Sequence, residues 1–178
     1  MKKFLVTIIL LALTTFLNAQ NKTSDTGTKI TFTANDISGK EVTSEIFGKN
    51  KVTMLNIWGT FCGPCIREMP DLAKLNEANK TNRVEVVGII IDILDRKGNV
   101  DPRIRTYAQT IIKKTEANYT HILPSKEMMT GLLRNIQVVP TTIFVDSNGK
   151  QIGEPYFGSR SQEDWQKIID ELLKNEIK

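Results

Sequence analysis

The sequence predicts an α/β fold, a three-layer α/β/α sandwich in which a central mixed sheet lies between two layers of helices. Two strongly apolar runs, Val52–Trp58 and Val84–Ile91, alternate with segments of amphipathic helical pattern. A pair of strands joined by a tight turn and a last helix close the chain. Because strands that alternate with helices pair in parallel through right-handed crossovers, this order of elements favours the sandwich.

An N-terminal β-hairpin extension is expected ahead of this unit. Ile30, Phe32 and Ala34 alternate with polar residues, which is typical of a half-buried strand. A turn over residues 36–40 and a short strand at Glu41–Thr43 complete the predicted hairpin.

The central elements follow from their apolar patterns. Val52–Trp58 is predicted as a buried strand, and Val84–Ile91 as a central strand covered on both faces, because it is nearly continuous in β-branched residues. The helix that begins at Pro64 has an apolar face made of Ile66, Met69, Leu72 and Ala73.

The C-terminal half repeats the alternation. Pro102 opens a helix whose apolar residues recur at helical spacing, and a short helix is predicted over Lys126–Leu133. Thr141–Val145 and Gln151–Phe157 are predicted to form a hairpin around a turn at residues 146–149. The apolar face of the last helix consists of Trp165, Ile168, Ile169, Leu172 and Leu173.

The N-terminus has the pattern of an export signal. Lys2 and Lys3 precede the apolar stretch Phe4–Leu17, which ends near the small residue Ala19. This stretch is shorter than the roughly 17–25 residues that span a membrane. We therefore expect a signal peptide over residues 1–19, a flexible linker over 20–28 and one domain over 29–178. An uncleaved N-terminal anchor, and with it contact with a membrane, is the alternative.

Charge indicates no nucleic-acid partner. The formal net charge is +4, and Lys and Arg are scattered among acidic residues instead of clustering with aromatic ones.

The two cysteines of the chain, Cys62 and Cys65, stand between a predicted strand and a predicted helix. At a helix start, free N–H groups and the helix dipole favour a thiolate, which is the nucleophilic form of cysteine. Pro64 suits the first turn because it has no N–H to leave unpaired. Cys62 is therefore predicted to attack a substrate disulfide, and Cys65 to resolve the mixed disulfide.

Other uses of a cysteine pair fit the sequence less well. Structural zinc usually needs four ligands, and the chain offers only His121 besides the cysteines. No histidine follows Cys65, so the pair is not a haem attachment site. A stabilising bridge is disfavoured because so short a loop removes little chain entropy.

Two blocks of sequence resemble the thioredoxin superfamily, and within it the exported TlpA/ResA-like thiol–disulfide oxidoreductases. The first block is Leu55–Cys65 with Glu68 and Pro70, and the second is Val138–Asp146. Trp58, Gly63 and Pro64 belong to the active-site motif. The resemblance implies a thioredoxin-like fold, a redox disulfide between Cys62 and Cys65, and no cofactor or metal.

The resemblance also assigns roles around the dithiol. Pro140 matches a cis-proline that faces the cysteines, and the backbone of Val139 would then pair with an extended substrate. Glu68 lies three residues after Cys65 on the same helix face and would tune the thiol pKa values or transfer protons.

Two departures from related proteins, and one longer segment, stand out. Asn56 occupies the position where cytoplasmic thioredoxins have a buried aspartate, so Glu68 is the candidate for proton transfer. Gly63 replaces the acidic residue that many ResA-like members have between the cysteines, which favours a reductase. The segment Asp92–Asn118 matches the insert of the TlpA/ResA branch, and its role is left open.

The predicted protein is thus a monomeric, extracytoplasmic reductase of oxidised exported proteins, with apocytochrome c as a candidate substrate. A membrane thiol-reductant transporter would supply its electrons. Alternatives are a disulfide oxidase or isomerase, and a copper-binding assembly chaperone that uses Cys62, Cys65 and His121. A peroxidase is disfavoured because no proline or threonine stands at the required positions before Cys62.

Overall fold

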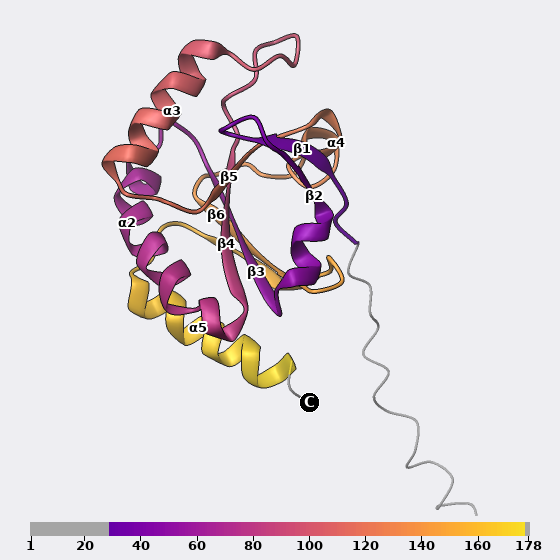
Figure 1. Ribbon diagram of the computed structural model, residues 1–178, viewed down its shortest axis with the longest axis vertical. Helices are drawn as coiled ribbons and strands as arrows, with labels where there is room; N and C mark the ends of the chain where they lie inside the picture. The colour runs from indigo at the N-terminus through magenta and orange to yellow at the C-terminus, as the bar shows by residue number, and fades with distance from the viewer. Residues whose placement is uncertain (1–28, 177–178) are drawn as a thin grey trace, which may run out of the picture.

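The computed structural model describes residues 29–176 (Figure 1), so the expected signal peptide and linker lie outside the described residues. The elements, in chain order, are β1 Thr33–Asp36, β2 Glu41–Thr43, η1 Ser44–Lys49, β3 Val52–Trp58, α2 Gly63–Ala78, η2 Lys80–Asn82, β4 Val84–Ile90, α3 Pro102–Lys114, β5 Thr120–Leu123, α4 Lys126–Thr130, β6 Thr141–Asp146, β7 Gln151–Phe157 and α5 Gln162–Glu176. None of the helices within residues 29–176 is long and apolar enough to cross a membrane.

The strands form one mixed sheet of seven strands in the order β2-β1-β5-β4-β3-β6-β7. β3 is parallel to β4 and antiparallel to β6, and β4 is also parallel to β5. Every residue of β3 is buried, because helices or loops cover this central strand on both faces. The mixed sheet predicted from the sequence is confirmed.

The sheet separates two apolar cores. Helices α2, α3 and α5 cover one face, where Leu72, Ile111 and Ile169 pack against the sheet. On the other face η1 and α4 contribute Phe47 and Met128 to a second, smaller core. The three layers of the prediction are therefore present, with the longer helices gathered on the face that also holds the cysteines.

The sequence analysis missed β5. This strand has only four residues, and it exists because it pairs with β4 on one side and with β1 on the other. Two boundaries also differ from the prediction. The first strand is Thr33–Asp36, later than the apolar alternation at 30–34 suggested, and α4 ends at Thr130, before Leu133. Pairing partners far along the chain decide these ends, and local patterns contain no information about them.

Gly88 in β4 allows an unusually close approach between two buried rings. It is the strand partner of Asn56 on one side and of His121 on the other. A Cβ atom at this position would lie 2.4 Å from Nδ1 of His121 and 3.0 Å from Nε1 of Trp58. The absence of a side chain therefore makes room for the contact between Trp58 and His121.

We expect Gly88→Ala to lower the free energy of unfolding by about 1–3 kcal/mol, the usual effect of overpacking a close-packed core. Urea unfolding followed by circular dichroism measures this change. Gly48→Ala is the matched control, because a Cβ at Gly48 meets nothing within 4 Å. Equal stability of the two variants would contradict the close packing around Gly88.

Candidate active site

The cysteine pair lies where β3 ends and α2 begins. Cys62 is the N-cap of α2, and its Sγ accepts a hydrogen bond of 3.2 Å from the backbone N–H of Cys65. Gly63 and Pro64 form the first positions of the helix, where a proline leaves no N–H group unsatisfied. The Sγ of Cys62 therefore lies at the positive end of the helix dipole, which stabilises a thiolate.

The two sulfur atoms are joined in a disulfide in this structure. Cys62 keeps 5% of its surface exposed and Cys65 only 1%. An incoming substrate sulfur would therefore reach Cys62 before Cys65.

The loop before β6 faces the cysteines. The peptide bond between Val139 and Pro140 is cis, as the resemblance implied. The carbonyl oxygen of Val139 lies 3.6 Å from the Sγ of Cys62. The hydroxyl of Thr141 donates to the carbonyl of Val138 at 2.7 Å, and the N–H of Gly158 donates to the carbonyl of Pro140 at 2.9 Å. These two bonds hold the loop next to the dithiol.

Glu68 is a buried carboxylate on α2, and it lies between the sheet and α5. Its Oε1 accepts hydrogen bonds from the indole N–H of Trp165 at 2.7 Å and from the backbone N–H of Arg160 at 2.8 Å. Its Oε2 lies 3.5 Å from the side-chain nitrogen of Asn56, which also donates to the hydroxyl of Thr142 at 3.2 Å. Glu68 is thus buried, and its carboxylate is hydrogen-bonded to the backbone of Arg160 and to the side chains of Trp165 and Asn56.

Burial raises the pKa of Glu68, while the hydrogen bonds from Arg160, Trp165 and Asn56 act in the opposite direction. A carboxyl group with a raised pKa can hold a proton closer to neutral pH than an ordinary glutamate. Sequence reasoning identified Glu68 but not Trp165 or Arg160, which lie more than 90 residues away along the chain. No local pattern links these positions.

Trp58 of the motif is directed away from solvent. Its indole N–H donates to Nδ1 of His121 at 3.3 Å, and Nε2 of His121 lies 3.0 Å from the carbonyl of Ala117. Burial lowers the pKa of His121 to about 4, so the ring is neutral at pH 7. With both ring nitrogens hydrogen-bonded, His121 is not available to bind copper beside the cysteines. Residues 29–176 contain no cluster of three or more His, Cys, Asp or Glu suited to a metal ion.

Asp92, the first residue of the predicted insert, fixes the loop before Cys62. Its carboxylate accepts bonds from the backbone N–H of Thr60 at 3.0 and 3.1 Å and from the Thr60 hydroxyl at 2.6 Å. The ring of Phe61, 71% exposed, covers Gly59, where a Cβ would come within 2.6 Å of it. Sequence analysis gave Asp92 no role, because only the sheet brings the end of β4 to this loop.

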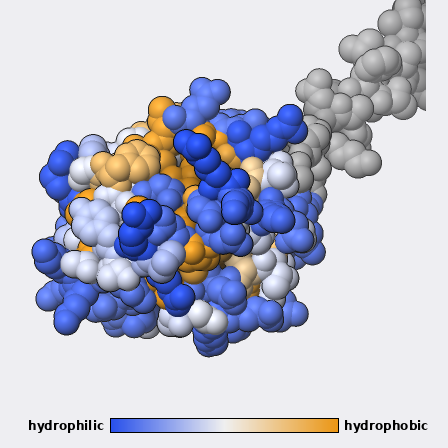
Figure 2. Space-filling model, turned by 90° about the horizontal axis from the view of Figure 1, so that it is seen from above, coloured by the Kyte–Doolittle hydropathy of each residue, from blue (hydrophilic) through white to orange (hydrophobic). Residues whose placement is uncertain are grey.

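Exposed apolar side chains gather near the dithiol. Figure 2 shows hydrophobic side chains along the middle of the upper face, with hydrophilic side chains around them. Three of the large exposed hydrophobic residues belong to segments next to the dithiol: Phe61 precedes Cys62, Val138 precedes the cis-proline loop, and Phe157 is the strand partner of Thr141. The surroundings of Cys62 therefore suit an apolar polypeptide better than a small charged molecule.

Comparison with known proteins identifies a matching family and relatives that are named as thiol-disulfide oxidoreductases. The profile of the AhpC/TSA family matches residues 26–151. The chain is 23% identical over 141 residues to the thiol-disulfide oxidoreductase ResA of Bacillus cereus, an alignment that covers 79% of this chain and 74% of the relative. It is 30% identical over 126 residues to ResA of Bacillus thuringiensis subsp. konkukian, covering 69% of this chain and 64% of the relative.

A solved structure shares the fold. The thiol:disulfide interchange protein of the thioredoxin family from Chlorobium tepidum superposes with a TM-score of 0.66 at 22% identity, covering 83% of this chain and 97% of that chain. At this identity the similarity supports the fold alone, and it confirms the thioredoxin-like fold predicted from the sequence.

The Glu68 environment predicts a dependence of stability on pH. Because the pKa of Glu68 is raised above its ordinary value of 4.5, folding favours the protonated form. The stability from this group is complete below pH 4.5 and is lost as the pH rises through the raised pKa. Since Gln cannot ionise, we expect Glu68→Gln to gain stability relative to wild type between about pH 4 and pH 8.

Urea unfolding of both proteins across this pH range measures the difference. Glu171→Gln, at an exposed position of α5, is the matched control for loss of a carboxylate. A stability difference between Glu68→Gln and wild type that does not change with pH would contradict a raised pKa for Glu68.

Proposed function

The chain belongs to the AhpC/TSA family and is a thiol–disulfide oxidoreductase, and on this basis we propose that it reduces disulfides of exported proteins. The observation that carries the proposal is the cysteine pair at the N-terminus of α2, with Cys62 Sγ 3.6 Å from the carbonyl of Val139. A sulfur nucleophile and a backbone acceptor for an extended substrate are thus adjacent.

The proposed reaction begins from the dithiol form. The Cys62 thiolate attacks one sulfur of a substrate disulfide, so that a mixed disulfide forms and one substrate thiolate leaves. The Cys65 thiolate then attacks the Sγ of Cys62 and releases the second substrate thiolate. Two electrons pass to the substrate, the two protons of the enzyme dithiol end on the substrate thiols, and the Cys62–Cys65 disulfide is formed.

Three further residues are proposed to assist. The backbone of Val139, held by the cis peptide bond to Pro140, would align the substrate chain beside Cys62. Glu68 would exchange a proton with Cys65, because it lies on the same helix face one turn later. Its raised pKa supports this role, since a group that protonates closer to neutral pH is a more effective acid or base.

The location and the direction of electron flow are also part of the proposal. The signal pattern over residues 1–19 favours an extracytoplasmic protein, and Cys62-Gly63-Pro64-Cys65 favours reduction. A membrane thiol-reductant transporter would then regenerate the dithiol, and apocytochrome c is a candidate substrate. A disulfide oxidase or isomerase remains the alternative within the same chemistry.

The reduction potential of the Cys62/Cys65 pair separates these alternatives. We expect a value near or below about −270 mV after equilibration in dithiothreitol buffers, as in reducing thioredoxins. The fraction of reduced enzyme is measured by alkylation of the free thiols. A value near about −120 mV would identify an oxidant and contradict the proposed direction.

Single cysteine variants test the order of attack. We expect Cys65→Ser to accumulate a mixed disulfide with substrate, because no thiolate resolves it, and Cys62→Ser to lose exchange by at least about a thousandfold. Non-reducing gel electrophoresis with mass spectrometry detects the trapped species. Turnover of Cys65→Ser at the wild-type rate would rule out the two-cysteine mechanism.

A further inference from the structure

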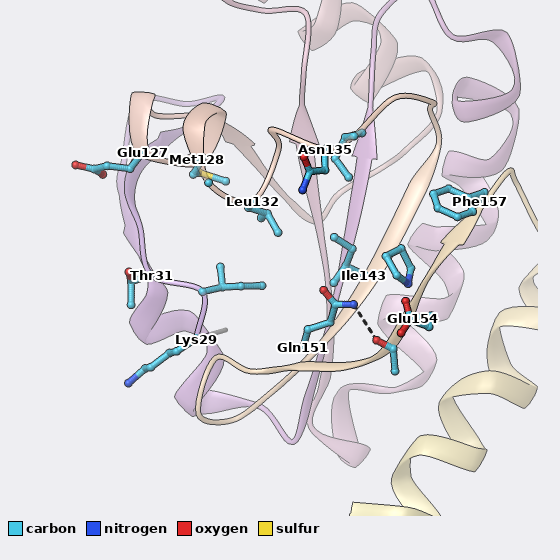
Figure 3. A pocket seen from close by; sticks show the side chains of 15 residues that line it. Lys29, Thr31, Glu127, Met128, Leu132, Asn135, Ile143, Gln151, Glu154 and Phe157 are labelled. Carbon is cyan, nitrogen blue, oxygen red and sulfur yellow. Dashed lines mark hydrogen bonds between the residues drawn. The ribbon is translucent and has the colours of Figure 1, made fainter. Parts of the chain in front are cut away.

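A groove of about 930 Å³ opens on the face of the sheet opposite α2 (Figure 3). One wall is β7, another is the segment Lys29–Thr31, and the third is α4 with the loop that follows it. Ile143 of β6 lies between these walls, and Leu132 and Ile136 add further apolar surface. The volume is at the upper end of the range for ligand sites, roughly 300–1,000 Å³.

One end of the groove adjoins the cis-proline loop. Phe157, which lines the groove and is 61% exposed, is the strand partner of Thr141, the residue after Pro140. The next residue, Gly158, donates its N–H to the carbonyl of Pro140. Ile136 lines the groove two residues before exposed Val138. An extended chain that leaves Cys62 along Val139 therefore meets the mouth of the groove.

The β7 wall offers backbone groups as well as side chains. Within its span, Gln151–Phe157, β7 pairs only with β6 among the described strands, so its other edge has no strand partner there. The Gly153 carbonyl on β7 accepts a hydrogen bond of 2.8 Å from the side chain of Gln151. Two residues interrupt this edge: Gly153 has a positive φ of 67°, and Pro155 has no N–H group. It therefore suits a short extended segment and not a long added strand.

The charges of the groove define the chemistry of its occupant. Figure 3 shows Glu154 on the β7 side, while Glu127 on the α4 side points its carboxylate away from the middle of the groove and Lys29 lies at the far end. Neither carboxylate forms an ion pair within residues 29–176. The Glu127 carboxylate accepts a hydrogen bond of 3.4 Å from the hydroxyl of Ser125, so Glu154 is the main charge that the groove offers. An exposed carboxylate beside apolar surface favours a segment that combines apolar and basic side chains.

We propose that this groove binds the polypeptide that flanks the substrate cysteine, as a short extended segment with apolar and basic side chains. The inference rests on the proposed function. In it, disulfide exchange takes place at Cys62, and the groove recognises the chain on one side of the substrate cysteine. Phe157 and Glu154 are the residues that would decide which flanking sequence is preferred.

Reduction kinetics with matched peptides test the proposal. The probes are mixed disulfides of glutathione with three peptides. One is a short cysteine peptide, and the other two extend it by alternating valine and lysine, either before or after the cysteine. We expect one of the extended peptides to have a KM about tenfold below that of the short one. Phe157→Ala and Glu154→Lys should each remove most of this advantage.

Two control variants keep the comparison specific. Tyr107→Ala removes an exposed aromatic side chain from α3, and Glu171→Lys reverses an exposed charge on α5. Both should retain the wild-type difference between short and extended peptides. Equal KM values for all peptides on the wild-type protein, or an advantage that survives both groove variants, would overturn the proposal. Equal KM values are also expected if the groove instead binds residues 20–28 or a small apolar molecule.

Direct binding distinguishes failure of the groove from failure of the proposed activity. The extended peptides with serine in place of cysteine cannot exchange disulfides, so fluorescence anisotropy reports their binding alone. We expect the serine peptide with the extension that lowers KM to bind saturably to the wild-type protein. Glu154→Lys should weaken its affinity about tenfold. Absence of binding would overturn the groove proposal even if the protein reduces every disulfide offered.

Discussion

The buried carboxylate of Glu68 is the interaction on which the arrangement of the active site depends. A buried carboxylate is costly unless donors surround it, and here the donors come from the sheet, from the loop before α5 and from α5 itself. These bonds connect the helix that begins at the cysteines to both of its neighbours. Arg160, whose backbone N–H is one donor, also lies over the rings of Tyr156 and Trp165 at 5.1 and 4.9 Å. The position of α2 and the environment of the ionisable group are therefore determined together.

Two fixed loops adjoin the dithiol. Asp92, at the end of β4, fixes the loop before Cys62 through Thr60, while Thr141 and Gly158 fix the cis-proline loop. All of these loops meet at the carboxyl end of β3, the edge at which α/β sheets commonly place their sites. The predicted insert thus contributes a structural contact at its first residue, and its helix α3 covers the sheet beside α2.

The aromatic residues around the cysteines divide into two groups. Trp58 is buried against His121, in space that Gly88 leaves open, whereas Phe61 and Phe157 face outward. The inward group supports the end of β3, and the outward group is free to contact a substrate. This division explains how a rigid site can accept flexible polypeptides: the sulfur chemistry takes place on fixed elements, and recognition extends along the surface to the groove beside β7.

The sequence by itself determined the features that local pattern encodes. Neighbouring residues determine strands β3 and β4, the helix start at Cys62-Gly63-Pro64-Cys65 and the closing hairpin. The reason is that the periodicity of apolar residues and helix capping both act over a few positions. Only the tertiary structure decided the existence of β5, the donors to Glu68, the bonds from Asp92 to Thr60 and the groove at Phe157. Each of these joins residues from separate elements, some more than 90 positions apart, and such contacts arise from how the sheet and helices pack.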